Sequence, residues 1–283
     1  MKKLIALLLA LMMILSLAAC GGSGSGDNST DEAEFPAYLK DLDLPEVTTI
    51  ENGKLILMTN CAFPPYELSS DGDGFYQGYE GIDIEIAWYL AQTLGLELVI
   101  EDVDFDASLI AVQQSKSDML LAGLTYNEER DETMDFSTSY AQGVQVVIVP
   151  EDSDIASPDD LEGKMIGTQR GTTGYIYCSD TPENGGYGED HVLAYDNGAQ
   201  AVQALQNGQV DAVVIDNGPA EEYVAANAGL KILDTEYITE DYCLAVKEGN
   251  SQLLDPLNTI LETMIENGLV DEIVSHYINA DAE

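Results

Sequence analysis

The two arginines of this chain are the residues best suited to hold a carboxylate. They stand against 52 aspartates and glutamates, with Arg130 in the polar segment 122–130 and Arg170 in the glycine-containing segment 167–174. A guanidinium is planar and offers a pair of donors that matches the two oxygens of a carboxylate. An ion pair within the protein is the commoner role of a lone arginine, and we favour it for Arg170. For Arg130, the surrounding residues favour a carboxylate that belongs to a ligand.

Asp216 offers the opposite chemistry. It follows an apolar segment, and its carboxylate could accept hydrogen bonds from a ligand ammonium group. An amino-acid zwitterion carries a carboxylate and an ammonium on one carbon, so Arg130 and Asp216 together would match both charges. Burial of charged groups is tolerable when each has such a partner. The alternative for Asp216 is to cap the helix that begins near Pro219, and one residue can do both.

Further polar and aromatic residues could complete such a site. Thr125 and the turn Gly171-Thr172-Thr173-Gly174 supply hydroxyl and backbone N–H groups at helix starts, where anions bind. The turn is a weak signal by itself, because many turns share its composition. Phe63 and Phe105 could cover a flat or apolar ligand side chain, although ordinary core packing is the alternative for each.

Strands and helices alternate along the chain, which predicts an α/β fold with mainly parallel sheets. Apolar runs predict the strands, and amphipathic runs predict the helices. An irregular stretch is expected between Arg130 and Tyr140. The predicted strands are 54–60, 96–101, 118–122, 144–149, 165–167, 192–195 and 210–215; the predicted helices are 82–94, 107–114, 250–267 and 269–278, with others that start near Thr173, Ala199 and Pro219.

One internal similarity predicts two equivalent lobes. Residues 112–121 match residues 205–214 in pattern, each as a helix end, a tight turn and a buried strand. Continuing the alignment places Gly123 opposite Asp216, just past the end of each strand. Ligands of open α/β sheets collect at such carboxyl ends, so two lobes with facing strand ends would form a cleft. A chance similarity between two units of this kind is the alternative.

The first twenty residues have the character of an export signal. Two lysines precede an apolar run, 4–17, which is short for a membrane span of about 20 residues. The sequence Leu-Ala-Ala-Cys resembles the bacterial lipoprotein box, which implies cleavage before Cys20 and a lipid on its sulfur. An ordinary secretory signal or an uncleaved anchor is the alternative. We therefore expect a protein lipid-anchored at the extracytoplasmic face of a bacterial cell membrane, with 21–50 as a flexible tether and lead-in.

Charge and cysteine content exclude other classes of partner. The formal net charge is −42, so binding to nucleic acid or to a membrane surface through charge is not expected. Contact with the membrane is expected through the lipid anchor only. Cys61, Cys178 and Cys243 are far apart from one another and from the two histidines, so no metal-ligand spacing exists. Buried free thiols are favoured, and no cofactor is predicted.

Taken together, the motifs resemble those of the solute-binding proteins of polar amino-acid ABC transporters, the family that includes the glutamine, histidine and lysine/arginine/ornithine binders. The resemblance covers residues 54–278, with the motifs in the family's order. It is carried by Phe63-Pro64-Pro65-Tyr66, Gly81-Ile82-Asp83-Ile84-Glu85-Ile86-Ala87, Ala122-Gly123-Leu124-Thr125 with Glu129-Arg130, Asp135-Phe136-Ser137 with Tyr140, Gly171-Thr172-Thr173, and Gly208-Gln209-Val210-Asp211-Ala212 through Asp216.

The resemblance implies a two-lobed, periplasmic-binding-protein-like fold with the ligand cleft between the lobes. Residues 51–142 with 240–283 would form one lobe and residues 143–239 the other. Two hinge crossings are expected near 142–146 and 237–243, and closure over the ligand would be a hinge motion.

The resemblance also implies the role of each site residue. Arg130 would hold the α-carboxylate with help from Thr125, and Asp216 would hold the α-ammonium together with the carbonyl of Gly123. The remaining ligand-binding positions are Thr172 and Thr173 at the carboxylate, Phe63 and Phe105 beside the side chain, and Asn60 and Gln169 at its far end.

Departures from the family pattern leave the ligand's side chain open. Asn127 replaces a usual threonine, Lys116 replaces a common glycine, and Arg170 occupies a variable place. A neutral polar side chain is our first expectation, because Asn60 and Gln169 offer amide groups. A cationic one is second, because the field of an acidic protein favours cations. Glutamate or aspartate is least expected, unless Arg170 points inward.

The function implied is that of a monomeric receptor, not an enzyme, that binds a free amino acid and delivers it to an ABC transporter permease. One alternative is a nutrient sensor that reports to a signalling partner. Another is a cyclohexadienyl or arogenate dehydratase on the same scaffold. That chemistry needs a positioned acid in the cleft, and only Glu67 and Glu85 lie near a motif.

Overall fold

The computed structural model describes residues 35–235 and 237–278. The chain falls into two compact units, Met1–Ala37 and Tyr38–Glu283, and the fold and site described below belong to the second. The predicted signal peptide, with Cys20, lies outside the described residues. A short helix, α2 (Ala37–Lys40), spans the boundary of the units. Within the described ranges, no helix combines the length and the apolar character that crossing a bilayer requires.

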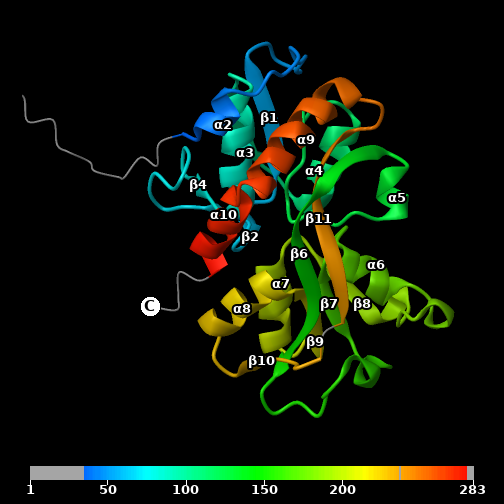
Figure 1. Ribbon diagram of the computed structural model, residues 1–283. Helices are drawn as coiled ribbons and strands as arrows, with labels where there is room; N and C mark the ends of the chain where they lie inside the picture. The colour runs from blue at the N-terminus through cyan, green and yellow to red at the C-terminus, as the bar shows by residue number, and fades with distance from the viewer. Residues whose placement is uncertain (1–34, 236, 279–283) are drawn as a thin grey trace, which may run out of the picture. The chain divides into compact units, whose positions relative to one another are not determined.

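The first lobe is built on a parallel pair of strands, β1 (Lys54–Thr59) and β5 (Glu97–Asp102). The apolar run Leu55–Leu57 is buried, as expected for a strand covered on both faces. The helices of this lobe are α3 (Ile82–Thr93), α4 (Phe105–Gln113), α5 (Glu128–Asp131), α9 (Ser251–Glu266) and α10 (Leu269–Ile278), and a small antiparallel sheet is formed by β2 (Ala62–Phe63), β3 (Glu67–Ser69) and β4 (Tyr79–Glu80) (Figure 1).

The second lobe is built on a six-stranded sheet with the order β10-β6-β9-β7-β8, in which β11 also pairs with β6. Alternate residues of β6 and β9 enter two different apolar clusters, for example Val146 and Val213 in one, and Val147 and Val214 in the other. The sheet is therefore buried on both faces. Its elements are β6 (Met134–Pro150), β7 (Ile166–Gln169), β8 (Val192–Tyr195), β9 (Ala212–Asp216), β10 (Leu230–Ile232), β11 (Ile238–Lys247), α6 (Thr173–Ser179), α7 (Gly198–Gln206) and α8 (Asn217–Ala226).

The predicted strand direction is right in part. The pairs β1–β5, β7–β8 and β7–β9 are parallel, whereas β6 is antiparallel to β9, β10 and β11. The prediction of mainly parallel sheets was therefore wrong for β6, because this strand returns through the sheet without a helical crossover. The two-lobed α/β architecture is confirmed.

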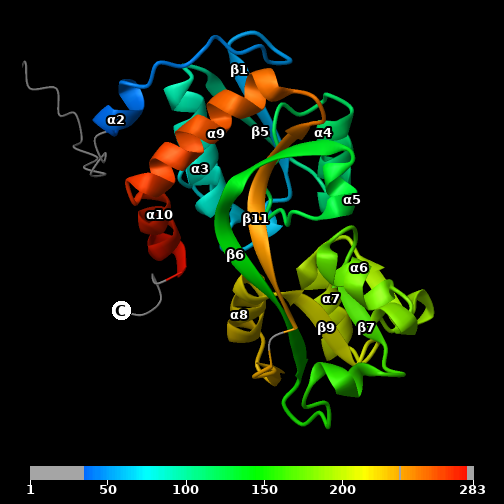
Figure 2. The same cartoon turned by 45° about the vertical axis from the view of Figure 1, so that its right-hand side comes forward.

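Two long strands, β6 and β11, connect the lobes. They pair with each other over most of their length, with Gln142 opposite Asp241 and Gln145 opposite Ile238, and they extend from one lobe into the other (Figures 1 and 2). The crossing predicted at 142–146 lies within β6, and the one predicted at 237–243 overlaps the start of β11. The irregular stretch predicted before Tyr140 was wrong, since it forms the first half of β6. Its pairing partner lies about a hundred residues further along the chain, which no local pattern reveals.

The internal similarity is confirmed by matching hydrogen bonds. Asp118 accepts from the backbone N of Ile56 at 2.8 Å, and Asp211 accepts from the backbone N of Met165 at 2.9 Å. In return, the backbone N of each aspartate donates to the carbonyl of the same residue, at 2.9 and 2.7 Å. Each aspartate thus fixes a helix–turn–strand unit beside the first strand of its own lobe.

Several element boundaries differ from those predicted, two of them beside the site. The strand expected at 118–122 is reduced to isolated bridges, Met119 with Leu57 and Leu120 with Ala245. Helix α4 starts at Phe105, two residues earlier than expected, with Asp104 preceding it. This shift places the Phe105 ring in the first turn, where it faces the space between the lobes.

Candidate functional site

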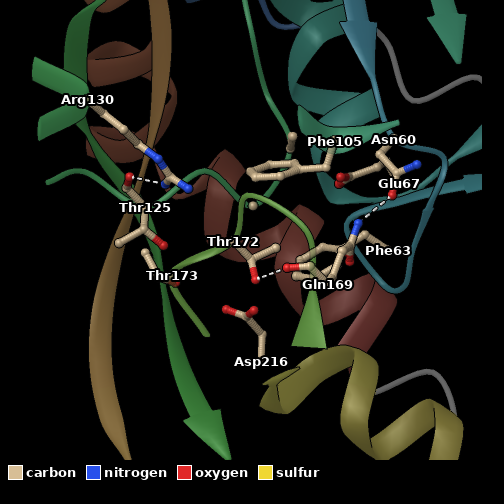
Figure 3. A pocket seen from close by; sticks show the side chains of 12 residues that line it. Asn60, Phe63, Glu67, Phe105, Thr125, Arg130, Gln169, Thr172, Thr173 and Asp216 are labelled. Atoms are coloured by element: carbon tan, nitrogen blue, oxygen red, sulfur yellow. Dashed lines mark hydrogen bonds between the residues drawn. The ribbon is translucent and has the colours of Figure 1, made fainter. Parts of the chain in front are cut away.

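All ten predicted ligand-binding residues line one cavity between the lobes. They come from both lobes, and four of them lie at or after the carboxyl end of a strand: Asn60 after β1, Phe105 after β5, Gln169 at the end of β7 and Asp216 at the end of β9. The empty space, counted to its open mouth, is about 310 Å³. The lining residues are Asn60, Phe63, Glu67, Phe105, Ala122, Gly123, Thr125, Arg130, Gln169, Thr172, Thr173 and Asp216 (Figure 3).

The lobes touch each other across this cavity. Arg130 Nη2 donates to the Gly171 carbonyl at 3.0 Å, and the Tyr223 hydroxyl donates to the Ala62 carbonyl at 3.1 Å. A third hydrogen bond joins Gln169 to Asn60. With the lobes in contact, the enclosed part has room for about one water molecule at most. An amino acid therefore requires the lobes to part or these side chains to shift.

Arg130 is a buried cation, and no carboxylate of the described residues pairs with it. Its side chain is 7% exposed, and no Asp or Glu oxygen of the described residues lies within 4.0 Å. Nη1 donates to the Thr125 carbonyl at 2.7 Å, and the guanidinium lies 5.7 Å from the Phe105 ring centre. Burial lowers the pKa of Arg130, which reflects the cost of the uncompensated charge. A ligand carboxylate would remove that cost.

Asn127 explains how Arg130 is positioned. Its side-chain Oδ1 accepts from the backbone N of Arg130 at 2.8 Å and so caps the short helix α5. Asparagine and threonine both serve as N-caps, so the departure from the family pattern at this position preserves the local structure. Asn127 does not line the cavity.

Asp216 faces the cavity at the end of β9, across from Arg130 (Figure 3). The Tyr242 hydroxyl donates to its Oδ1. It precedes α8, but its side chain makes no capping hydrogen bond, so the cap alternative is wrong. Burial, followed by the charge of Glu240, raises the pKa of Asp216. A ligand ammonium would provide the missing positive charge and favour the ionised form.

Thr125 and Thr173 line the cavity, but their hydroxyls have another partner here. Both donate to Oε2 of Glu240, at 3.1 and 3.0 Å, and Gln145 Nε2 donates to the same oxygen at 2.9 Å. The hydroxyl of Thr172 donates to the Gln169 carbonyl at 2.8 Å, at the start of α6. Glu240 is a buried carboxylate that sequence reasoning missed, because no motif marks its position in β11.

Phe63 and Gly123 form a tight contact on the wall of the cavity. A Cβ added to Gly123 would lie 2.6 Å from Cε1 of Phe63, and the glycine has φ +51°. Both the close approach and the left-handed backbone favour glycine here. The backbone N of Gly123 donates to Asp83 Oδ2 at 2.8 Å, which anchors the loop after the Ala122 segment. Phe105, like Phe63, is 6% exposed.

Asn60 and Gln169 are bonded to each other. Gln169 Nε2 donates to Asn60 Oδ1 at 3.0 Å and to the Asp196 carbonyl at 3.5 Å, while Asn60 Nδ2 donates to the Val103 carbonyl at 3.0 Å. Within the described part of the chain, Gln169 Oε1 has no hydrogen-bond partner. The amide groups predicted to meet the far end of the ligand are therefore largely occupied.

Glu67 is the second residue of the site that sequence reasoning did not assign to ligand binding. It is fully buried in β3 and lines the cavity, and among described residues neither carboxylate oxygen has a hydrogen-bond partner. Burial, together with the charges of Asp83, Asp216 and Asp102, raises its pKa well above the usual value. Its position after the Phe63–Tyr66 motif was noted only for a catalytic acid.

Arg170 does not belong to the cavity. Its side chain is half exposed, lies 3.8 Å from an Asp196 oxygen, and donates to the Ala194 carbonyl at 3.1 Å. The prediction of an ion pair within the protein is confirmed. Such exposed pairs contribute little to stability.

The cysteines are separated in the structure as in the sequence. Cys61, Cys178 and Cys243 are buried free thiols, as predicted. Burial raises the pKa of the Cys178 thiol to about 12 and that of the Cys243 thiol to about 11, which suppresses thiolate chemistry. Searching the described residues for three or more His, Cys, Asp or Glu placed to hold a metal ion finds no such group.

Comparison with known proteins places this geometry in a family. The model of the bacterial extracellular solute-binding proteins, family 3, matches residues 55–280. The arginine-binding extracellular protein ArtP of Bacillus subtilis (strain 168) is 29% identical over 285 residues, which cover 99% of this chain and 100% of that protein. A probable histidine-binding protein of Neisseria gonorrhoeae is 30% identical over 283 residues, 98% of this chain and 96% of that protein.

Solved structures agree with the sequence comparison. An ancestral arginine-binding protein bound to arginine is 36% identical and superimposes with a TM-score of 0.72, covering 80% of this chain and 98% of that one. A match over most of the chain, with the same two-lobed architecture, goes beyond a shared fold. The chain belongs to the bacterial extracellular solute-binding proteins, family 3.

Proposed function

We propose that this protein binds a free amino acid in the cavity between its lobes and delivers it to an ABC transporter permease. Arg130 would hold the α-carboxylate and Asp216 the α-ammonium. Phe63 and Phe105 would flank the side chain, and Gly123, Thr125, Thr172 and Thr173 would complete the contacts around the α-carbon.

The observation that carries this proposal is the isolation of Arg130. A buried guanidinium that has no carboxylate partner among the described residues faces a cavity whose opposite wall holds a buried carboxylate, Asp216. An α-amino acid is the smallest common solute that presents a matching charge to each. Relatives that by name bind arginine and histidine support the same reading.

Binding would proceed with closure of the lobes. Arg130 donates to the Gly171 carbonyl of the other lobe, which supports a ligand carboxylate that would touch both lobes. On ligand binding, the hydroxyls of Thr125 and Thr173 would either donate to the ligand instead of Glu240 or keep their hydrogen bonds to Glu240. If closure depends on such contacts, the closed shape forms mainly when ligand is bound. A permease would then recognise the loaded protein by its closed shape.

The remaining parts of the proposal concern the cell surface. A lipid on Cys20, with 21–50 as a tether, would hold the protein as a monomer at the extracytoplasmic face of the membrane. Replacement of Cys20 by serine should release the protein from isolated membranes. Retention of that variant in the membrane fraction would contradict the lipid anchor.

A thermal-shift screen of the full chain with the twenty amino acids tests ligand binding. Any ligand carried through purification is first removed by dialysis in denaturant, followed by refolding. A ligand at a hundred times its dissociation constant should add about 2.7 kcal/mol of stability. If none of the twenty shifts the melting temperature, free amino acids are not the ligands.

The position of Glu67 gives the dehydratase alternative one specific observation. A carboxyl with a raised pKa stands inside the cavity, as a general acid would. Incubation with arogenate and with prephenate separates the two functions. Stoichiometric binding without product supports the receptor, whereas product formed with turnover would replace it by the enzyme.

A further inference from the structure

Glu67 is a buried carboxylate that lacks a partner inside the proposed amino-acid site. It is fully buried, and in the described part of the chain both of its oxygens are without a hydrogen bond. A buried carboxylate needs a cation or several donors to be stable in its ionised form. Of the twelve lining residues, the only cation is Arg130, which the proposed function assigns to the ligand's α-carboxylate.

We propose that Glu67 determines specificity at the far end of the cavity and selects an amino acid whose side chain is a cation, a guanidinium or an ammonium. This inference rests on the proposed function of the site. It names the class of side chain and the residue that recognises it.

The balance of charges in the cavity supports this assignment. Of the lining residues, Arg130 is a cation and Asp216 and Glu67 are carboxyl groups. The nearby carboxylate Glu240 does not line the cavity and accepts hydrogen bonds from Thr125, Thr173 and Gln145. A zwitterion with an uncharged side chain neutralises Arg130 and Asp216 but leaves Glu67 unmatched. A zwitterion with a cationic side chain matches all three groups, which is the condition for their burial together.

The spare hydrogen-bonding groups at this end are mostly acceptors. Both Glu67 oxygens and Gln169 Oε1 have no partner among described residues. The Gln169 amide nitrogen is used by Asn60 and Asp196, and the Asn60 amide nitrogen donates to Val103. Guanidinium and ammonium groups carry donors only, so they fit this set. A side-chain carboxylate would meet acceptors and a negative charge.

The walls of the cavity suit a flat cation. Phe63 and Phe105 are buried beside it, and in Figure 3 Glu67, Asn60 and Gln169 lie on the side away from Arg130. Aromatic faces attract cations, and a guanidinium stacks on them. The first expectation from the sequence, a neutral polar side chain, relied on amide groups that the structure shows bonded to each other.

Binding of L-arginine and L-citrulline to the full chain tests the inference by calorimetry. In citrulline, an uncharged urea group of nearly the same shape replaces the guanidinium of arginine. Wild-type protein should bind arginine at least about 30-fold tighter, the lower bound for leaving a buried charge unpaired. In Glu67→Gln this ratio should fall below about fivefold, because the glutamine no longer distinguishes the charges.

A matched control is available on α3. Glu85 is a glutamate that is partly buried, whereas Glu67 is fully buried, and it does not line the cavity, so Glu85→Gln should keep the wild-type ratio. The ratio compares two ligands on one protein, so a general loss of stability does not alter it. If Glu67→Gln fails to fold, the wild-type ratio decides: arginine and citrulline bound within threefold of each other overturn the inference.

The outcomes separate the inference from the function beneath it. Binding of a neutral amino acid that Glu67→Gln leaves unchanged, with no preference for arginine or lysine, would overturn the role of Glu67 and keep the receptor. Absence of binding by any amino acid would overturn the proposed function itself.

Discussion

Replacement of Arg130 by alanine is the most direct test of the site. The guanidinium has five N–H donors, of which two are used by the carbonyls of Thr125 and Gly171, and three remain. A ligand carboxylate needs two of these for a bidentate contact. The substitution therefore removes a complete charge partner, not a peripheral contact.

The magnitude follows from the burial of the pair. Removal of one partner of a buried, hydrogen-bonded charge pair costs about 2–5 kcal/mol, because the other charge stays buried and unmatched. Affinity should fall by about 30- to 5,000-fold, at 1.4 kcal/mol for each factor of ten. Stability should change less. Two hydrogen bonds worth about 1 kcal/mol each are lost, while a buried and unpaired charge is removed.

Calorimetry with the amino acid identified by the thermal-shift screen measures the effect. Arg170→Ala is the matched control, since it removes the only other arginine, which lies outside the cavity. Its affinity should equal that of the wild type. Arg130→Lys should fall between, because lysine keeps the charge without the planar pair of donors. An affinity of Arg130→Ala within twofold of the wild type would refute the role of Arg130.

Three further predictions concern the buried groups around the site. Asp216→Asn should weaken ligand binding by about 2–5 kcal/mol without lowering the stability of the ligand-free protein. Calorimetry measures the affinity and urea denaturation measures the stability. An unchanged affinity would exclude a contact between Asp216 and the ligand ammonium. Burial raises the pKa of Asp83 to about 7 and also raises that of Asp216, whereas the unfolded chain releases both protons near pH 4. The folded protein thus holds extra protons, so its unfolding free energy should decrease as the pH rises from about 4 to 7, with Asp216→Asn showing a flatter dependence in denaturation at pH 5 and pH 8. Gly123→Ala should destabilise the protein by more than about 1 kcal/mol relative to Gly53→Ala, because both glycines have positive φ but only Gly123 would meet Phe63, and equal melting temperatures would contradict this contact.

Local pattern predicted those parts of the fold in which neighbours in sequence are also neighbours in space. The strand at 192–195 and the helix at 269–278 have the predicted bounds, and the match of 112–121 with 205–214 reappears as paired hydrogen bonds. Such units consist of a helix, a turn and a strand in contact with each other. The spacing of apolar residues and the residues of the turn are therefore sufficient to predict them. Strand β6 fails this condition, because its partners come from three other strands, β9, β10 and β11, that all follow it by tens of residues.

The sequence by itself determined which chemistry the cavity holds. With two arginines in the chain, and one of them in a loop after an apolar segment, Arg130 and Asp216 were identifiable as a pair from residue type and from their place after strand ends. Strand ends in an α/β sheet gather at one edge whatever the intervening loops do, and this regularity predicted that Gly123 and Asp216 face one cleft. Asn60 and Gln169, in contrast, were predicted only from the resemblance to the family.

Only the tertiary structure decided which of those groups are free to meet a ligand. In the structure, Gln169 donates a hydrogen bond to Asn60, and the hydroxyls of Thr125 and Thr173 donate to Glu240. Glu67 has no hydrogen-bond partner among described residues. Hydrogen bonds between residues a hundred positions apart depend on how the two lobes face each other. That arrangement is set by the pairing of β6 with β11, which local sequence does not encode.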